Sequence, residues 1–364
     1  MYEWIYMMPE EQAVWFWRII MGFILIFGAM IGSFLNVCIY RIPLEQSVSR
    51  PRSHCFSCNK MIPWYHNIPV LSWLILRGKC AYCKAPFSAR YMIIEVITAV
   101  LFLLVFQTVF NPGLFGLTKL QFPLLIPFYW LFVASTIVNI GIDIDHRILL
   151  DRISLGGTII TFVVAGFIPE LLNESTWIGG LSASFIGAFT GFAIGYGISA
   201  FGEKIFLQDA FGFGDVKWMM LFGAIFGWRG MFFILMLAAI IGLLIGLPCM
   251  LLQRRKNEND TDAPFAMPFG PALGVGALLW LFWRHQIYRG IAKAKLFMET
   301  NDAAVLMILL PILLLSTAWL IYRIHIIRKA IREEEANETT LETPLTPVED
   351  LPEAKTESSD SKDN

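Results

Sequence analysis

The chain has 364 residues, of which 56% are hydrophobic and only 16% are charged. Its mean hydropathy of +0.61 lies outside the usual range of soluble globular domains and predicts an integral membrane protein in contact with membrane lipids. The formal net charge is −1, so the charge balance gives no reason to expect nucleic acid as a partner.

Apolar runs that suit a bilayer recur along the chain, since about 20 apolar residues cover the hydrocarbon layer. We identify nine candidate runs, of which the sixth is short: 14–40, 92–111, 123–142, 153–169, 177–201, 214–228, 231–252, 268–283 and 303–323. The first run is long and has no basic segment before it, so we predict a retained span rather than a secretory signal. The expected fold is an all-α polytopic membrane protein with eight or nine transmembrane helices.

The first loop is strongly basic. Residues 1–13 contain no lysine or arginine, whereas 41–90 contain eight, and basic loops face the cytoplasm. With alternating spans, the segments around Asp143 and Asp215 then return to the same cytoplasmic side.

Four of the six cysteines lie in this loop, in the sequences CFSC and CAYC. Two CxxC pairs at this separation are typical of a closed four-thiolate zinc site, here Cys55, Cys58, Cys80 and Cys83. A disulfide reading conflicts with the reducing cytoplasm. We therefore predict a structural zinc, which has no open position for catalysis, and keep metal-free reduced cysteines as the alternative.

Two acidic stretches stand at the ends of apolar runs: GIDIDHRILLD (141–151) and AFGFGDVKWMM (210–220). A charged group in a membrane span costs about 2.5–3.5 kcal/mol on insertion scales, which makes it a functional candidate. Two aspartates held close together in a poorly solvated place share one proton. The ionised one can activate water while the other polarises a peptide carbonyl. Ordinary loop carboxylates or helix N-caps are the alternative.

Geometry leaves the upstream partner open. In a continuous helix Asp143 and Asp145 point about 200° apart, so at most one faces the bundle interior. Gly212 and Gly214 suit close approach of a substrate or helix to Asp215. A third stretch, MPFGPAL (267–273), leaves backbone groups unpaired and suits the lining of a cavity or a turn into a helix.

The C-terminal part departs from this plan. The segment RHQIYRGIAKAK (284–295) is basic although alternation places it outside, so we interpret it as an interfacial helix or a miscount of one span. The acidic tail 333–364 is predicted to be disordered.

Six stretches, in order, resemble the type IV prepilin peptidases, bifunctional membrane enzymes of the GxGD aspartyl protease group. The resemblance covers residues 30–275. The stretches are GSFLNVCIYRIP (32–43), the double CxxC loop, RYMIIEV (90–96), IDIDHRILLD (142–151), GFGDVK (212–217) and MPFGPAL.

The resemblance implies that Asp143 and Asp215 are the catalytic pair. It implies pilin-like or pseudopilin-like precursors as substrates, cut after a glycine at the cytoplasmic face of the bacterial inner membrane. Gly212, Gly214 and the PFGPAL residues Pro268, Gly270 and Pro271 are then expected to help bind the extended substrate.

The resemblance also implies methyl transfer from S-adenosylmethionine to the new N-terminus by the N-terminal part. Glu95 could bind the incoming ammonium or be an interface carboxylate. The sequence departs from the family pattern at Leu150, His66, Met92 and Asp209, outside the aspartate pair.

These expectations define four parts of the chain. They are 1–110 with the cysteine loop 41–91, the peptidase core 111–284, an extra span in 285–332 and the tail 333–364.

Two other functions are kept as alternatives. One is a proton-coupled transporter, against which stands the lack of a polar series across the bilayer. The other is an inactive relative that serves as a scaffold.

Overall fold

The computed structural model describes residues 10–110, 122–206, 212–256, 269–300 and 322. The described residues form α-helices and two short 3₁₀-helices, with no strand among them. The α-helices are α2 Glu10–Arg41, α3 Leu71–Ile75, α4 Arg90–Phe110, α5 Phe122–His146, α6 Asp151–Phe167, α7 Trp177–Phe206, α8 Phe213–Lys256 and α9 Gly270–Thr300. The 3₁₀-helices are η1 Trp64–His66 and η2 Pro169–Leu172. The chain divides into two compact units, Met1–Ala292 and Lys293–Asn364, and the description below concerns the first.

Five helices in the described residues are long and apolar enough to cross a membrane: Val14–Arg41, Arg90–Val109, Leu124–His146, Trp177–Lys204 and Phe213–Gly246. The all-α multi-pass architecture predicted from the sequence is therefore confirmed. Helix α6, at Asp151–Phe167, covers most of the predicted run 153–169 and has 17 residues. The ninth predicted run and the acidic tail lie outside the described residues, apart from Tyr322.

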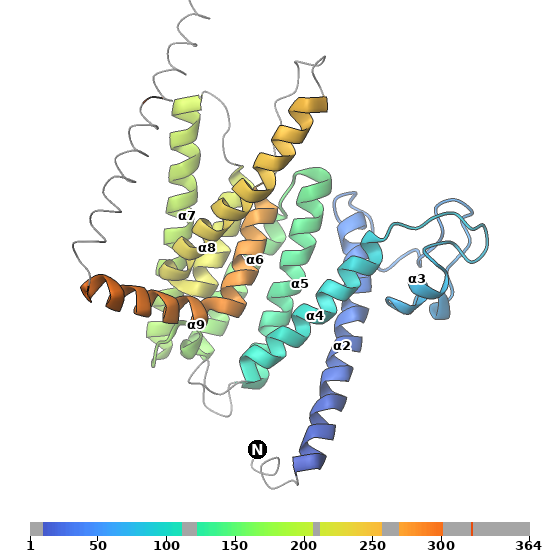
Figure 1. Ribbon diagram of the computed structural model, residues 1–364, viewed down its shortest axis with the longest axis horizontal. Coiled ribbons are helices and arrows are strands. Elements are labelled where there is room, and N and C mark those ends of the chain that lie inside the picture. Colours follow the sequence, from blue (N-terminus) through green and yellow to red (C-terminus); the bar gives the residue numbers. More distant parts are fainter. Residues whose placement is uncertain (1–9, 111–121, 207–211, 257–268, 301–321, 323–364) are drawn as a thin grey trace, which may run out of the picture. The chain divides into compact units, whose positions relative to one another are not determined.

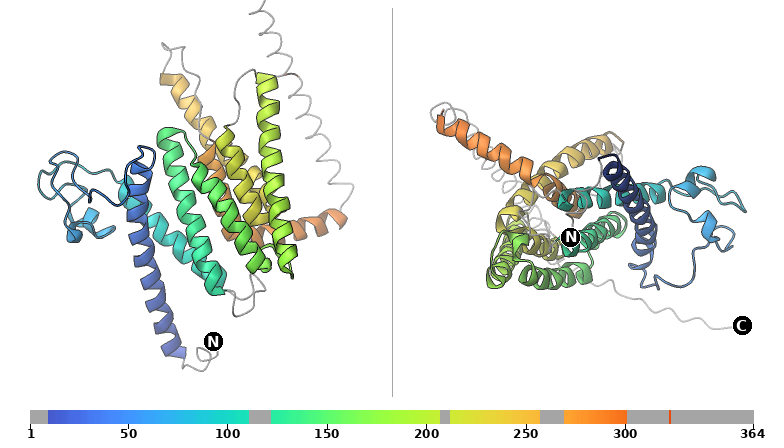
Figure 2. Two further views of the ribbon diagram at one scale, coloured as in Figure 1. Left: turned by 180° about the vertical axis from the view of Figure 1, so that it is seen from behind. Right: turned by 90° about the horizontal axis from the view of Figure 1, so that it is seen from below.

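Helix α5 lies between the N-terminal helices and the rest of the unit. Figures 1 and 2 show α2 and α4 on one side of α5 and helices α6 to α8 on the other. Of its most apolar window, 61% is buried, against 39% or less in the other four spans, which leave more apolar surface for lipid. Phe132 of α5 contacts the rings of Phe222 and Phe226 of α8, with centroids 5.9 and 5.5 Å apart.

A stripe of glycines brings α7 against α8. Gly187, Gly191 and Gly195 recur every four residues and therefore share one face of α7. A Cβ on Gly187 would overlap the carbonyl oxygen of Gly223, and one on Gly191 would overlap that of Met219. Small residues at this spacing allow close backbone packing in a membrane, where lipid is as apolar as the helices themselves. The stripe thus fixes the first half of α8, which carries Asp215.

Helix α8 reverses direction at Gly227, whose backbone is not helical (φ 71°, ψ 173°). A Cβ on Gly274 of α9 would lie 2.8 Å from the Trp218 ring, before the break. A Cβ on Gly276 would lie 3.0 Å from the Ile234 carbonyl oxygen, after it. The break falls beside the predicted boundary between the runs 214–228 and 231–252.

Helix α9 begins at the predicted run 268–283 and continues through 284–295, so the basic segment is helical rather than a loop.

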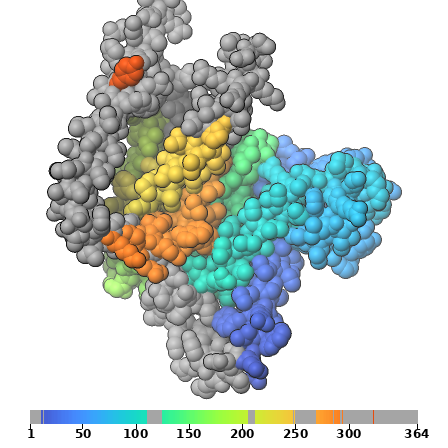
Figure 3. All heavy atoms as spheres, viewed as in Figure 1, coloured from blue at the N-terminus to red at the C-terminus, as the bar shows by residue number. Residues whose placement is uncertain are grey.

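The chemistry-bearing segments gather at one end of the unit. Helix α2 ends there at Arg41 and α4 begins there at Arg90, with the cysteine loop between them. In the space-filling view the atoms of this loop form one lobe beside the start of α4 (Figure 3). The end of α5 and the starts of α8 and α9 meet at the same end, as the contacts of the aspartates described next require.

Candidate functional site

The structure brings Asp143 and Asp215 together around Gly270. A Cβ built on Gly270 would overlap Asp143 Oδ2 and would lie 3.4 Å from Asp215 Oδ1. The two carboxylate oxygens therefore both lie within 3.4 Å of one point beside Gly270, which brings the two side chains close together. Asp143 comes from the last turn of α5, Asp215 from the first turn of α8, and Gly270 is the first residue of α9.

Burial distinguishes Asp143 from Asp145, which helix geometry alone did not. Asp143 is only 5% exposed, whereas Asp145 is turned outward to an ion pair with Arg90. Helix α5 ends just beyond them: Arg147 has φ 56° and its N–H donates to the Asp143 carbonyl oxygen at 2.9 Å. A left-handed residue at this position is a common helix stop. It directs the chain back along α5, where the Leu150 N–H donates to the Asn139 side chain at 3.4 Å.

The glycines around Asp215 have distinct roles. The Gly212 carbonyl oxygen accepts from the Asp215 N–H at 3.0 Å, and a Cβ on Gly212 would lie 3.3 Å from Asp215 Oδ2. A Cβ on Gly214 would lie 3.0 Å from the Leu149 side chain. Gly212 thus opens the approach to the carboxylate, and Gly214 allows the α5–α6 connection to pack closely. Asp215 Oδ1 is buried without a hydrogen-bond partner among the described residues.

The MPFGPAL stretch places its Gly270 beside the two aspartates. Gly270 and Pro271 form the first turn of α9, where the missing N–H of proline is tolerated. The backbone at Gly270 approaches both carboxylates because it has no side chain. Pro268, which was predicted to help bind substrate, lies outside the described residues.

The cysteine loop contains two copies of one turn, 25 residues apart. The Cys55 N–H donates to the Lys60 carbonyl, and the Asn59 N–H donates back to Cys55. The same two hydrogen bonds recur in the second copy, in which Cys80, Lys84 and Ala85 replace Cys55, Asn59 and Lys60. Asn59 and Lys84 both adopt positive φ, at 57° and 61°. The two copies share only their cysteines in sequence.

The two turns bring the four cysteine sulfurs together, all within 4.8 Å of one another. Cys55 Sγ and Cys83 Sγ lie 3.7 Å apart, close to the roughly 3.8 Å that a tetrahedron with Zn–S bonds of about 2.3 Å requires. Backbone N–H groups of Cys58 and Ser57 donate to the Cys55 sulfur and lower its pKa to about 6, which favours the thiolate that binds metal. These residues fit the predicted metal site and would hold a zinc ion through four thiolates.

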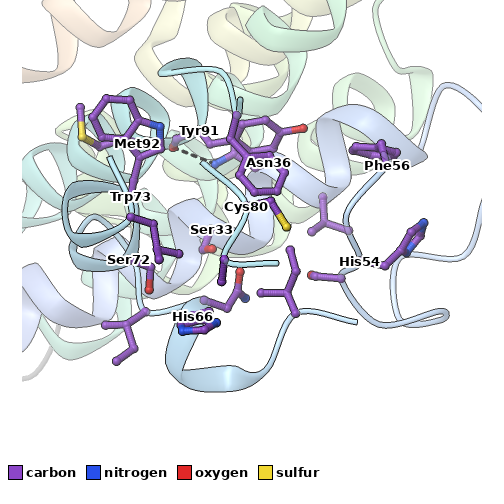
Figure 4. Close-up of a pocket in the computed structure, with 18 of the residues that line it drawn as sticks. Ser33, Asn36, His54, Phe56, His66, Ser72, Trp73, Cys80, Tyr91 and Met92 are labelled. Carbon is purple, nitrogen blue, oxygen red and sulfur yellow. Dashed lines mark hydrogen bonds between the residues drawn. The ribbon is translucent and has the colours of Figure 1, made fainter. Parts of the chain in front are cut away.

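A cavity of about 610 Å³ lies between the cysteine loop and the membrane helices (Figure 4). Its wall includes Ser33 and Asn36 of α2, and Tyr91 and Glu95 of α4. Glu95 is 8% exposed, and its Oε2 accepts from the Val70 N–H at 2.7 Å. The loop therefore closes onto α4 through this carboxylate. Aromatic side chains from both parts complete the lining: Tyr40, Phe56, Trp73, Tyr82 and Phe87.

The structure also gives contacts to residues for which the sequence predicted no role. Arg90 and Lys217 stand within quoted motifs, but each acquires a partner only through folding: Asp145 for Arg90 and Asp151 for Lys217. His66 also lines the cavity and has a buried Nδ1 without a partner among the described residues. No spacing rule signals these pairs, because the partners lie on different helices.

The structure is that of a multi-pass helical membrane protein in which two aspartates lie close together at one end of the helix bundle. Residues 26–109 match the family model of the bacterial peptidase A24 N-terminal domain, and residues 125–247 match that of the type IV leader peptidase family. The chain therefore belongs to the type IV leader peptidase family, which confirms the resemblance drawn from the motifs.

Similar proteins include three called prepilin leader peptidase/N-methyltransferase. That of Myxococcus xanthus is 34% identical over 246 residues, which cover 66% of this chain and 68% of the relative. That of Legionella pneumophila is 32% identical over 297 residues, covering 75% and 93%. That of Aeromonas hydrophila is 30% identical over 290 residues, covering 73% and 91%. No solved structure matches the chain.

Proposed function

We propose that this chain is an aspartic peptidase that removes the leader of type IV prepilin or pseudopilin precursors, cutting after glycine at the cytoplasmic face of the bacterial inner membrane. The observation that carries the proposal is the close approach of both Asp143 and Asp215 to Gly270. Family membership and the names of the relatives supply the substrate class.

In the proposed reaction the ionised carboxylate takes a proton from water. The water oxygen attacks the scissile carbonyl carbon, while the protonated carboxyl donates to the carbonyl oxygen. The carboxyl group that took the water proton then gives it to the leaving nitrogen as the C–N bond breaks, and the proton on the former carbonyl oxygen returns to the other carboxylate. The step needs neither a metal nor a covalent enzyme intermediate. The open backbone at Gly270 would let an extended substrate chain lie against both acids.

The placement of charge favours hydrolysis over proton transport. In the described residues the buried charged side chains are Arg41, Glu95 and Asp143, all near the end of the unit that carries the cysteine loop. A proton path would need titratable groups through the depth of the bilayer.

The peptidase proposal is tested with purified protein in lipid nanodiscs and a prepilin that has a Gly-Phe junction. Asp143→Asn and Asp215→Asn are each expected to lower kcat by about 10² to 10⁴, the usual size of an acid–base contribution. Glu203→Gln, at an exposed position near the end of α7, is the control and should cleave like the parent. Cleavage that survives either asparagine substitution contradicts the assignment.

We further propose that the cavity beside Glu95 is where the new N-terminus is methylated. S-adenosylmethionine, when bound, supplies a methyl group on a positively charged sulfur, and the aromatic lining suits a cation. Glu95 would hold the incoming N-terminal ammonium and accept its proton, so that the free amine can attack the methyl carbon. The cysteine cluster, with zinc, would keep the loop closed over this cavity.

Glu95→Gln separates the two activities. Methylation of a pre-cleaved pilin is expected to fall by about 10² or more, because the amine loses its proton acceptor, while leader cleavage continues. Mass spectrometry of the product N-terminus measures both. Glu45→Gln, at an exposed position outside the cavity, is the matched control. Equal loss of both activities in Glu95→Gln contradicts the assignment.

A further inference from the structure

Two ion pairs flank the aspartate site. Arg90 Nη1 of α4 lies 2.6 Å from Asp145 Oδ1 of α5. Lys217 Nζ of α8 lies 2.7 Å from Asp151 Oδ2, on the first residue of α6. Each pair contains the residue two positions after a proposed catalytic aspartate, since Asp145 follows Asp143 and Lys217 follows Asp215.

This spacing has a geometric consequence. Residues i and i+2 of a helix point about 200° apart, so an ion pair that fixes the direction of the second residue also directs the first to the opposite side of the helix. Both aspartates lie in terminal turns, the last of α5 and the first of α8. Terminal turns are where helices fray, so packing alone constrains them least. Arg90 holds its turn at a second point as well, through Nη2 to the Gly141 carbonyl oxygen at 3.2 Å.

We propose that Arg90–Asp145 and Lys217–Asp151 are positioning pairs, which fix the rotation of the two helix ends and so keep both carboxylates close together beside Gly270. The inference rests on the proposed peptidase function. The paired side chains are 20% to 56% exposed, and pairs of this kind contribute little to global stability. We expect these pairs to affect the position of the catalytic groups, because a misplacement of about 1 Å can lower a catalytic rate by about 10².

The Arg90–Asp145 pair also connects the two regions of the chain that match the two family models. Arg90 lies within the residues that match the N-terminal domain model, and Asp145 within those that match the leader peptidase model. The next residue, Tyr91, lines the cavity beside Glu95. The N-terminal part thus becomes a support for the peptidase site, in addition to its own proposed chemistry.

A double-mutant cycle on Lys217 and Asp151 tests the inference. Lys217→Gln and Asp151→Asn remove the pair without adding a carboxylate near the site. Each is expected to lower kcat for prepilin cleavage by about tenfold or more, with little change in KM, and the double variant should be no worse than either single. Lys217→Arg and Asp151→Glu keep the charges and should retain most activity. The same design applies to Arg90→Gln and Asp145→Asn.

Lys204→Gln, at an exposed lysine in the last turn of α7, is the matched control and should behave like the parent. Wild-type kcat in the neutral variants, or losses that multiply in the double variant, overturns the inference and leaves the peptidase proposal intact.

A readout that does not depend on cleavage is backbone amide exchange at 143–147 and 213–217. It should be faster in the neutral variants and unchanged in Lys204→Gln. Unchanged exchange at both helix ends overturns the inference. A parent that does not cleave prepilin refutes the peptidase proposal instead, and the exchange result still decides whether the pairs hold the helix ends.

Discussion

The cysteine loop and the aspartate site are built in opposite ways. In the loop, each CxxC turn is closed by hydrogen bonds within a few residues, and the second turn repeats the first. At the aspartate site, Asp143 and Asp215 come from the ends of two helices with α6 and α7 between them. The first site is encoded by local spacing and the second by helix packing. A change in packing should therefore damage the aspartate site and spare the loop.

Among changes that leave both aspartates in place, the largest expected effect comes from Gly270→Ala. The added Cβ would overlap Asp143 Oδ2 and approach Asp215 Oδ1, so one carboxylate must move. We expect kcat for prepilin cleavage to fall by about 10² or more, because the acids lose their mutual geometry. Steady-state kinetics in nanodiscs measure the effect.

Gly242→Ala is the matched control for this change. It lies on the neighbouring helix α8, where a Cβ would only reach ordinary contact at 3.9 Å with Ala272 and Phe269. It should retain parental activity. A Gly270→Ala variant that cleaves as fast as Gly242→Ala would mean that the two carboxylates do not depend on this close approach.

The difference between the two sites also explains what the sequence could predict. The zinc site could be proposed from four cysteines and their separation, because a tight turn sets its own geometry. The pairing of Asp143 with Asp215 could be proposed only from the topology and the family resemblance. The choice of Asp143 over Asp145 came from the family resemblance, and the burial of Asp143 and the ion pair of Asp145 are consistent with it. That ion pair depends on α4 lying beside α5, which no local pattern encodes.

A smaller and separable effect is expected from the cysteine loop. Cys55→Ser and Cys80→Ser should lower the zinc content from about one per chain, and lower methylation by about tenfold or more as the loop loosens over its cavity. Leader cleavage should fall less, because the four clustered cysteines lie in the loop between α2 and α4, whereas the aspartate pair lies on α5 and α8. Metal analysis and the two activity assays are made on the same preparations.

Cys38→Ala serves as the control, since Cys38 is buried in α2 outside the cluster. Parental protein that contains no zinc would refute the metal site. An equal loss of cleavage and methylation in Cys55→Ser would contradict the separation of the two regions.

The smallest effect is expected from the glycine stripe of α7. In Gly187→Ala the new methyl group meets the Gly223 carbonyl oxygen, and overpacking of this kind costs about 1–3 kcal/mol of stability. Gly197→Ala on the same helix meets nothing within 4 Å and should be neutral or stabilising by up to about 1 kcal/mol. Unfolding in mixed micelles measures both, and equal stability of the two variants would contradict the close α7–α8 packing.

The reversal of α8 shows another limit of sequence reasoning. Hydropathy separated the runs 214–228 and 231–252, and Gly227 breaks the helix between their centres. Hydropathy could not show that both halves lie along α9, since that depends on the contacts of Trp218 and Ile234 with its glycines. The segment 284–295 was interpreted as an interfacial helix or a miscount of one span, and in the structure it is the helical continuation of α9.

The most direct test of the central claim is whether Asp143 and Asp215 act as one unit. Leader cleavage is compared in Asp143→Asn, Asp215→Asn and the double variant, with methylation of a pre-cleaved pilin as the measure of intact fold. We predict that each single variant loses nearly all cleavage, that the double variant is no slower than the singles within about twofold, and that all three still methylate. Cleavage that persists in either single variant, or losses that multiply in the double variant, would contradict the account.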